Sequence, residues 1–340
     1  VQDAASTPNT IAANTTVVFA GLVKAQGFLL MEFYTGIGGV AVTDLTGNAK
    51  YPDSPDASEL LTAFDTPNAW GDDYGGRVTG WITPEVTGDY YFFIRADDAC
   101  DLYVGIDETI PEYTDTGLLA ATSAGLACCA AFQEPGDART SQTIFLEAGQ
   151  EYGVLFLMKE GGGGDWAQVA WALANDYAAG SAGTLPVIPG EYLSTWADPT
   201  GASIEFTTSP MDTQGVEAKT ATFTVAVNSS SPYVSYQWLE DGAEIPGATG
   251  TRYTTPMLAM GDSGTEYSVR VTIPGLTEIS PVATLTVVPD TFPPVIVSTG
   301  ALPKNGVHEV GILFDEALNA TTAGTMGNYS ISAGTINSAT

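Results

Sequence analysis

The sequence TGDYYFFIRADD, at residues 87–98, joins a Gly-Asp turn signal to a run of aromatic and β-branched residues, which is typical of a β-strand. Further runs of this kind, with turn signals between them, occur at residues 80–83, 143–146, 152–158 and 168–171. Only residues 57–64 suggest a short helix. We therefore expect an all-β chain.

Composition narrows the function classes. The chain has 340 residues, enough for two or three domains, and carries 40 acidic against 10 basic residues, a formal charge of −30. Such a surface repels nucleic acid and anionic lipid, so we expect neither as a partner. Such a surface also attracts divalent cations, although solubility in a saline medium explains the negative charge equally well.

Membrane insertion is not expected. The longest apolar stretch, residues 17–33, contains Lys24 and Glu32, which excludes a membrane span.

Small-residue and proline clusters mark the expected boundaries. The first lies near residue 199, and Pro289 with Pro293-Pro294 makes a stiff joint. We expect an N-terminal extension or strand at 1–27, domains at 28–198 and 199–289, and a partial domain at 290–340. Residues 15–19 are a candidate strand of the extension, which completes the first domain or pairs with a neighbouring subunit.

The first domain resembles the PA14 family, a β-sandwich of bacterial toxins, glycosidases and adhesins. The resemblance rests on residues 33–37, 74–82, 87–92, 96–98, 102–104, 146–150, 159–165 and 169–171, and it extends over residues 28–193. It implies a PA14-like β-sandwich at the start of the chain.

The resemblance also implies a calcium site. In lectin-type members, the pair equivalent to Asp97-Asp98 is joined by a cis peptide, which turns both carboxylates to one side where Ca²⁺ can bridge them. The glycine-rich segment 160–166 supplies the other half of the expected site, because glycines turn tightly and expose carbonyl oxygens. The expected metal ligands are Asp97, Asp98, Gly163 and Asp165, with Glu160 and Gln168 as weaker candidates.

The same resemblance implies that a sugar binds to this calcium through two neighbouring hydroxyls. The expected carbohydrate-binding residues are Asp97, Asp98 and Trp166, whose ring would stack on the sugar. Yeast adhesins of the family carry an Asn in the second calcium loop, whereas this chain has Asp165 after four glycines. That difference bears on sugar specificity. Trp171 alternates with core positions and is expected to be buried.

The three cysteines, Cys100, Cys128 and Cys129, do not have the spacing of zinc ligands. One interpretation is a disulfide from Cys100 to Cys128 or Cys129. The alternative is three small buried side chains.

Residues 201–288 resemble bacterial immunoglobulin-like modules. Trp238 fits the core tryptophan of the third strand, and Tyr267 fits the tyrosine corner, where its hydroxyl bonds back to the chain. Val225 and Val269 occupy the two positions at which such domains usually carry the cysteines of a disulfide. Residues 292–340 resemble the start of another such module. The fold expected for the whole chain is a PA14-like β-sandwich followed by one complete and one partial Ig-like β-sandwich.

Catalysis is not expected, because the only histidine, His308, lies in the C-terminal region, away from any candidate nucleophile. The favoured function is a secreted or cell-surface, calcium-dependent protein that binds carbohydrate or cell-surface glycans on Ig-like spacers. One alternative is a structural subunit of an extracellular filament, stalk or surface layer, which self-associates through its domains. Another is an accessory region of a larger polysaccharide-degrading enzyme.

Overall fold

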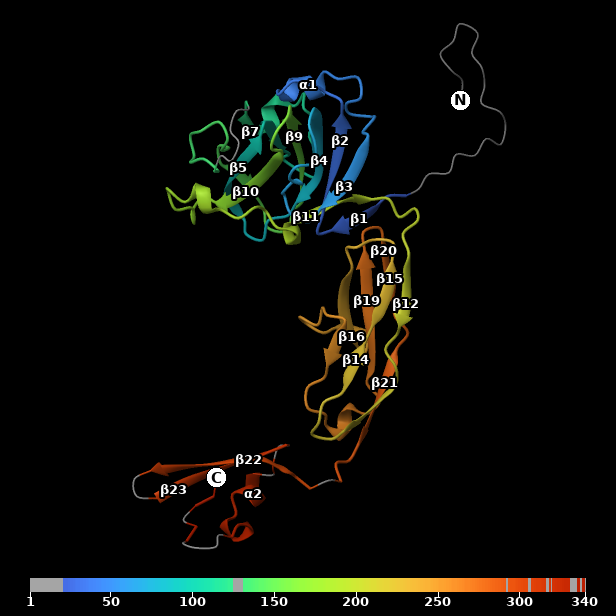
Figure 1. Cartoon of the computed structure of the whole chain (residues 1–340), viewed down its shortest axis with the longest axis vertical. Coiled ribbons are helices and arrows are strands. Elements are labelled where there is room, and N and C mark those ends of the chain that lie inside the picture. Colours follow the sequence, from blue (N-terminus) through green and yellow to red (C-terminus); the bar gives the residue numbers. More distant parts are fainter. Residues whose placement is uncertain are drawn as a thin grey trace, which may run out of the picture. The chain divides into compact units, whose positions relative to one another are not determined.

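The computed structural model describes residues 21–124, 131–291, 293–304, 307–315, 318, 320–330, 335–336 and 338–339. The chain divides into two compact units, Val1–Ala202 and Ser203–Thr340 (Figure 1). Strands dominate both units, which confirms the all-β prediction. None of the helices in the described ranges is long and apolar enough to cross a membrane.

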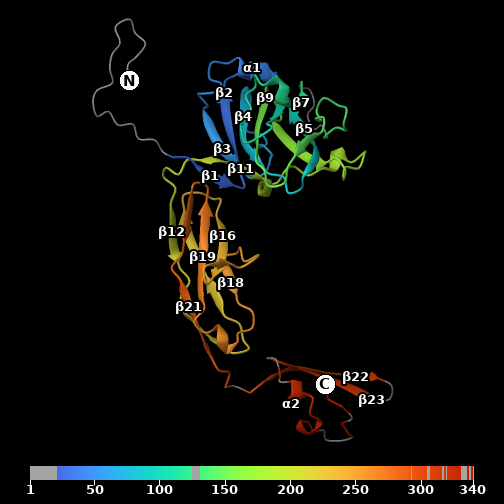
Figure 2. The same cartoon turned by 180° about the vertical axis from the view of Figure 1, so that it is seen from behind.

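Unit 1 contains two facing sheets. The larger has the order β1-β11-β4-β9-β6-β7, with β2 also paired to β4 and β3 to β2, and the smaller has the order β10-β5-β8. The bounds are β1 Val23–Gln26, β2 Leu29–Thr35, β3 Ala57–Leu61, β4 Tyr74–Ile82, β5 Gly88–Asp97, β6 Ala99–Val104, β7 Leu119–Ser123, β8 Ile144–Leu146, β9 Tyr152–Glu160, β10 Trp166–Leu173 and β11 Leu193–Ala197. Figure 2 shows both sheets from behind.

Strand β9 organises the core of unit 1. All nine of its residues are buried, because it lies between β4 and β6 and is covered on both faces. Phe156 and Met158 point into the core between the two sheets, whereas Leu155 and Leu157 pack under helix α1 (Val42–Thr46). A strand covered on both sides needs apolar residues in succession, which explains the continuous run that the sequence shows there.

The predicted helix at residues 57–64 is wrong. Ala57–Leu61 is β3, which pairs antiparallel with β2 in the register Leu29↔Leu61. A short helix has few internal hydrogen bonds, and pairing with β2 satisfies the backbone of this segment and buries Leu61. The helix of this region is instead α1, where the Asp44 carboxylate accepts a hydrogen bond from the nitrogen of Ala41.

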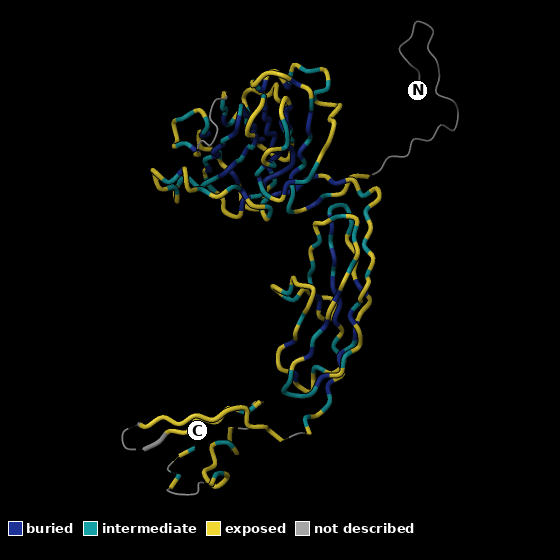
Figure 3. The backbone as a smooth tube through the Cα atoms, viewed as in Figure 1, coloured by how far each residue is buried: buried dark blue, intermediate teal, exposed yellow. Residues whose placement is uncertain are grey.

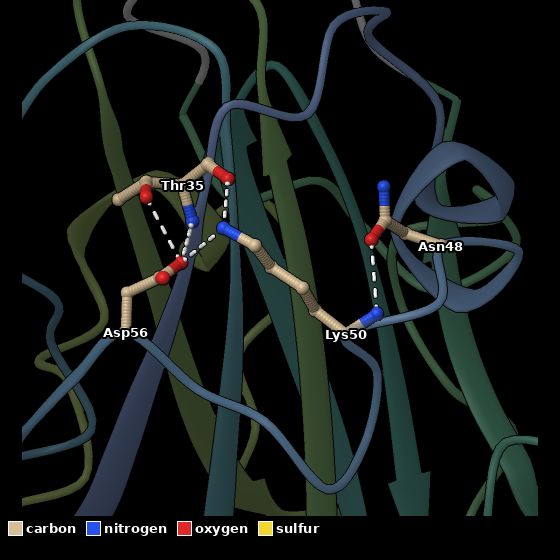
Figure 4. A network of polar contacts seen from close by, with 4 residues as sticks. All are labelled: Thr35, Asn48, Lys50 and Asp56. Carbon is tan, nitrogen blue, oxygen red and sulfur yellow. Dashed lines mark hydrogen bonds and ion pairs between the residues drawn. The ribbon is translucent and has the colours of Figure 1, made fainter.

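A polar clamp closes the connection between β2 and β3. Lys50 Nζ donates to the carbonyl of Thr35, at 2.8 Å, and to Asp56 Oδ2, at 2.7 Å (Figure 4). The same carboxylate oxygen accepts from the nitrogen and hydroxyl of Thr35. These bonds, first of all the one from Lys50, lower the pKa of Asp56 to about 2. The clamp fixes the end of β2.

Unit 2 contains the second sandwich. Its bounds are β12 Ile204–Thr208, β13 Thr213–Val216, β14 Thr222–Thr224, β15 Ala226–Ser229, β16 Ser235–Glu240, β17 Ala243–Glu244, β18 Arg252–Thr254, β19 Glu266–Ile273, β20 Leu276–Ile279 and β21 Ala283–Val288. Trp238 is fully buried, and Val225 and Val269 share its core cluster, as the sequence predicts. Figure 3 shows the buried positions along the inner strands.

One expectation for unit 2 needs correction. The hydroxyl of Tyr267 donates to Oε1 of Glu240, at 2.8 Å, and not to the backbone. Glu240 ends β16 directly opposite Tyr267 in the β16–β19 register, which brings the carboxylate within reach. The Ig-like assignment itself stays a prediction from the sequence.

The C-terminal region forms a hairpin of β22 (Ile296–Lys304) and β23 (Val307–Phe314), followed by the single turn α2 (Ala320–Ala323). His308 lies on β23, opposite Pro303. The candidate strand at residues 15–19 lies outside the described residues.

Candidate functional site

The candidate site forms where the two sheets of unit 1 meet. Asp97 is the last residue of β5 in the smaller sheet, and Ala99 begins β6 in the larger one. Asp98 therefore links the sheets. The peptide bond between Asp97 and Asp98 is cis, as the resemblance implied. Asp98 donates its backbone N–H to the carbonyl of Lys159, at 3.2 Å, which holds the acid pair against the end of β9.

The glycine loop at residues 161–164 lies against this acid pair. The nitrogen of Gly161 donates to Asp98 Oδ2, at 3.1 Å. A Cβ added to Gly161 would lie 3.3 Å from the same oxygen, and one added to Gly164 would lie 3.1 Å from Asp97 Oδ2. Both positions favour glycine because the backbone approaches the carboxylates so closely. Gly163 has a φ of +121°, a conformation that L side chains rarely adopt.

Two more carboxylates complete the cluster. Glu160 ends β9 and Asp165 immediately precedes β10, and each is only 1% exposed. Asp97 is 8% exposed. Among the described residues, both side-chain oxygens of Glu160 and Oδ1 of Asp165 are buried without a hydrogen-bond partner. Unpaired buried acceptors are costly, so three such atoms in one place call for a partner.

The second oxygen of Asp165 is satisfied, because Oδ2 accepts from the nitrogen of Gly71, at 2.9 Å. The hydroxyl of Tyr74 lies near the same carboxylate, and burial, followed by Asp165, raises the pKa of Tyr74 well above its ordinary value. The pair does not reach ordinary hydrogen-bond geometry, since the hydroxyl of Tyr74 is also buried and unpaired within the described residues. The bond from Gly71 thus holds Asp165 in place and leaves Oδ1 available.

The carboxylates of the cluster influence one another's protonation. Burial, followed by the charges of Asp98, Asp97 and Asp165, raises the pKa of Glu160 to about 7. Burial, followed by Asp98 and Asp165, raises the pKa of Asp97. Like charges in a poorly solvated place disfavour ionisation, and a bound cation would reverse that effect.

Lys159 is a functional candidate that the sequence analysis missed. Its side chain is fully buried, and Nζ donates to the carbonyls of Gly39, at 2.8 Å, and Glu160. No carboxylate of the described residues lies within 4 Å of this ammonium group. Lys159 therefore ties residues 38–40 to the end of β9, and among the described residues no cationic group lies within 4 Å of the carboxylate cluster. The signal in the sequence is a lysine directly after the apolar run of β9.

The donor set fits calcium. Four carboxylates and a flexible glycine backbone offer the hard oxygen ligands that Ca²⁺ accepts in numbers of six to eight. Among the described residues, no three Asp, Glu, His or Cys side chains converge tightly enough to enclose an ion as they stand. Binding therefore requires the carboxylates to rotate inward. Among the described residues, neither oxygen of Glu160 accepts a hydrogen bond of ordinary geometry, although the backbone N–H of Gly162 lies near enough to lower the pKa of Glu160, so its side chain is only weakly held.

The outer face of the β5–β10 pair flanks the cluster. Trp166 stands opposite Asp97 in the register, and its indole is half-buried. Gln168 is engaged elsewhere, since it accepts from Arg95 Nε and donates to Asp65 Oδ1. Its side chain is thus occupied away from the acid pair.

Trp171, expected to be buried, is half-buried instead and packs between Tyr90 and Tyr192 at the edge of the core. Cys100 is a buried free thiol in the structure, and its possible pairing with Cys128 or Cys129 stays a prediction. Cys128 and Cys129 lie outside the described residues.

A hollow of about 670 Å³ lies at the opposite ends of β4 and β9, and Glu85, Glu108, Glu151, Glu191 and Tyr192 are among the residues that line it. None of the predicted ligands lines this hollow.

Comparisons with known proteins agree with the expected location of the domain. Residues 53–178 match the family model of the PA14 domain, and this segment contains all the predicted metal and sugar ligands. No curated protein sequence matches the chain.

Several solved structures are similar to part of this chain. The PA14 sugar-binding domain from an RTX adhesin is 16% identical with a TM-score of 0.37, and the match covers 50% of this chain and 99% of that one. The PA14 domain of the MpAFP antifreeze protein is 14% identical with a TM-score of 0.35, covering 55% and 96%. The epithelial adhesin 9 A domain from Candida glabrata, in complex with Galb1-3GlcNAc, is 12% identical with a TM-score of 0.34, covering 52% and 91%.

Proposed function

We propose that unit 1 binds Ca²⁺ at the cluster of Asp97, Asp98, Glu160 and Asp165, and that it binds carbohydrate through this ion. The observation that carries the proposal is the set of buried, unpaired carboxylate oxygens on Glu160 and Asp165 beside the Asp97-Asp98 pair. The match of residues 53–178 to the PA14 domain supports the same function.

The ion would supply positive charge to four carboxylates that have no direct ionic partner among the described residues. Asp97 and Asp98 would hold it from the β5–β6 junction, and Glu160 and Asp165 from the two ends of the glycine loop. The hydrogen bond from Gly161 to Asp98 orients one ligand before the ion arrives. Gly163 is exposed, and its carbonyl oxygen would complete the ligand set.

Sugar recognition follows from the position of Trp166. Register places this residue beside Asp97, at the rim of the cluster, with part of its indole exposed. An aromatic ring next to an ion that accepts hydroxyl oxygens suits a sugar, which has both an apolar ring face and polar edges. The protein would act outside the cell or at its surface, where free calcium suffices for sites of modest affinity.

Glycan binding tests this function. The full chain is applied to an array of neutral and acidic glycans in calcium buffer and again after chelation with EDTA. We expect binding to at least one glycan class with calcium, and its loss in EDTA or in Asp98→Asn. Asp107→Asn serves as the control, because the carboxylate of Asp107 is exposed and, among the described residues, accepts hydrogen bonds only from Thr109 in the same turn. Binding that persists in EDTA, or an array with no binding at all, would overturn the proposal.

A further inference from the structure

The outer face of the β5–β10 pair carries an arginine held beside the candidate sugar site. Side chains of Arg95, Asp97, Trp166 and Gln168 share this face, because the register pairs Trp166 with Asp97 and Gln168 with Arg95. The intervening residues, such as Ile94 and Val169, point into the core. Arg95 therefore lies two residues from Asp97, a strand distance of roughly 6.6 Å.

Neighbouring side chains fix the guanidinium group. Its central carbon lies 4.3 Å from the ring centre of Phe132 and 5.3 Å from that of Trp166. Nε donates to Gln168 Oε1, at 2.7 Å, and Gln168 in turn donates to Asp65 Oδ1. Two aromatic rings and one hydrogen bond thus hold Arg95 in one orientation. A cation fixed in this way loses little entropy when it binds a ligand.

Among the described residues, the terminal nitrogens of Arg95 have no partner. Within the described parts of the chain, they donate no hydrogen bond, and no carboxylate lies within 4 Å of the guanidinium group. The chain has 40 acidic and only 10 basic residues, and the other described basic residues of unit 1 are all engaged: Lys24, Lys50, Arg77 and Arg139 have ionic partners, and the Nζ of Lys159 donates to two backbone carbonyls. The two Nη groups present a fork that matches a carboxylate.

We propose that the glycan bound at this site carries a carboxylate, as a hexuronic acid does, and that Arg95 recognises it while the calcium ion holds the sugar hydroxyls. This inference rests on the proposed function. Arg95 is then a specificity-determining residue. The overall charge of −30 gives an acidic sugar no long-range attraction, so the preference arises from direct contact and should persist at about 0.15 M salt.

Two ligands that differ only at the carboxylate test the inference. Methyl glucuronide and methyl glucoside are titrated into the calcium-loaded full chain by NMR or calorimetry. We expect the glucuronide to bind roughly tenfold more tightly, because a hydrogen bond to a charged partner adds about that factor. Arg95→Gln should remove this preference by weakening the glucuronide alone, and Arg95→Lys should retain part of it.

Arg270→Gln is the matched control, since it removes the same charge from unit 2, where Arg270 pairs with Glu244. Melting temperature and calcium affinity are measured for every variant to exclude misfolding. Equal binding of the two sugars by the wild type would overturn the inference and leave the proposed function intact. Equal weakening of both sugars in Arg95→Gln would also overturn it, since Arg95 would then only position Trp166. If neither sugar and no glycan of the array binds, both this inference and the proposed function are overturned.

Discussion

The backbone nitrogen of Gly161 donates a hydrogen bond to Asp98 Oδ2, at 3.1 Å, although 63 residues separate the two in sequence. This bond joins the glycine loop to the Asp97-Asp98 pair, so the two halves of the candidate calcium site form one structure. The loop and the acid pair are therefore expected to respond together when either is altered.

Gly161→Ala should weaken calcium binding. A Cβ at this position would lie 2.7 Å from Val40 Cγ1 and 3.3 Å from Asp98 Oδ2, so either the loop or the carboxylate must shift. Loss of a supporting hydrogen bond to a metal ligand typically lowers affinity about tenfold or more. Calorimetric calcium titration measures the change. Gly162→Ala is the matched control, because its Cβ would meet only Asp72, at 3.7 Å. Equal calcium affinity in both variants would show that Gly161 does not support the site.

Glu160→Gln should act in opposite directions on stability and on calcium affinity. The substitution keeps the shape and removes a buried charge that lies near three other carboxylates, so without calcium the unfolding free energy at pH 8 should rise by about 1–3 kcal/mol. Calcium affinity should fall, because one anionic ligand is lost. Denaturant unfolding in EDTA and calcium titration test the two effects. A variant that is less stable in EDTA would contradict the account of charge repulsion.

Stability without calcium should depend on pH. The pKa of Glu160 is about 7 in the folded protein and near 4.5 when unperturbed, so between these values the folded state binds more protons than the unfolded state. The unfolding free energy should therefore fall as pH rises from 5 to 7, by at most about 1.4 kcal/mol per pH unit from this group. Denaturant unfolding in EDTA across this range measures the slope. Glu160→Gln should flatten it, and a slope unchanged by the substitution would assign the effect to other groups.

Lys159→Met should destabilise unit 1 through the connection at residues 38–40. The substitution keeps most of the buried volume but leaves the carbonyl of Gly39 without its donor, at a cost of about 1–3 kcal/mol. Lys50→Met, which breaks a half-exposed ion pair and a hydrogen bond to the partly exposed carbonyl of Thr35, should cost less, because water can replace both partners. Chemical unfolding compares the two variants. Equal costs would show that the buried position of Lys159 adds nothing.

The parts of the fold that local pattern determines could be read from sequence. Alternating or continuous apolar runs predicted β4, β5, β8, β9 and β10, and the spread of motifs located the PA14-like segment that the family model matches. The structure differs from the predicted helix at residues 57–64, because the conformation of this segment depends on pairing with β2, which is remote in sequence. Local pattern carries no information about such a partner.

In the candidate site, too, local pattern predicted some residues, and others depend on partners remote in sequence. Asp97, Asp98 and the glycine loop stood out as motifs, but Lys159 and Arg95 did not. Their roles depend on what surrounds them: the carbonyl of Gly39 for Lys159, and the rings of Phe132 and Trp166 for Arg95. These contacts join residues that lie far apart along the chain, so only the folded structure could reveal them.

A crystal structure grown with CaCl₂ tests the central claim most directly. The account predicts a single anomalous density peak bounded by Asp97, Asp98 and Asp165, with Glu160 turned toward it and coordination distances of about 2.3–2.6 Å. The same crystals soaked in EDTA should lose the peak. A fully calcium-soaked crystal with no ion at the Asp97-Asp98 pair, or with the ion held by other residues, would contradict it.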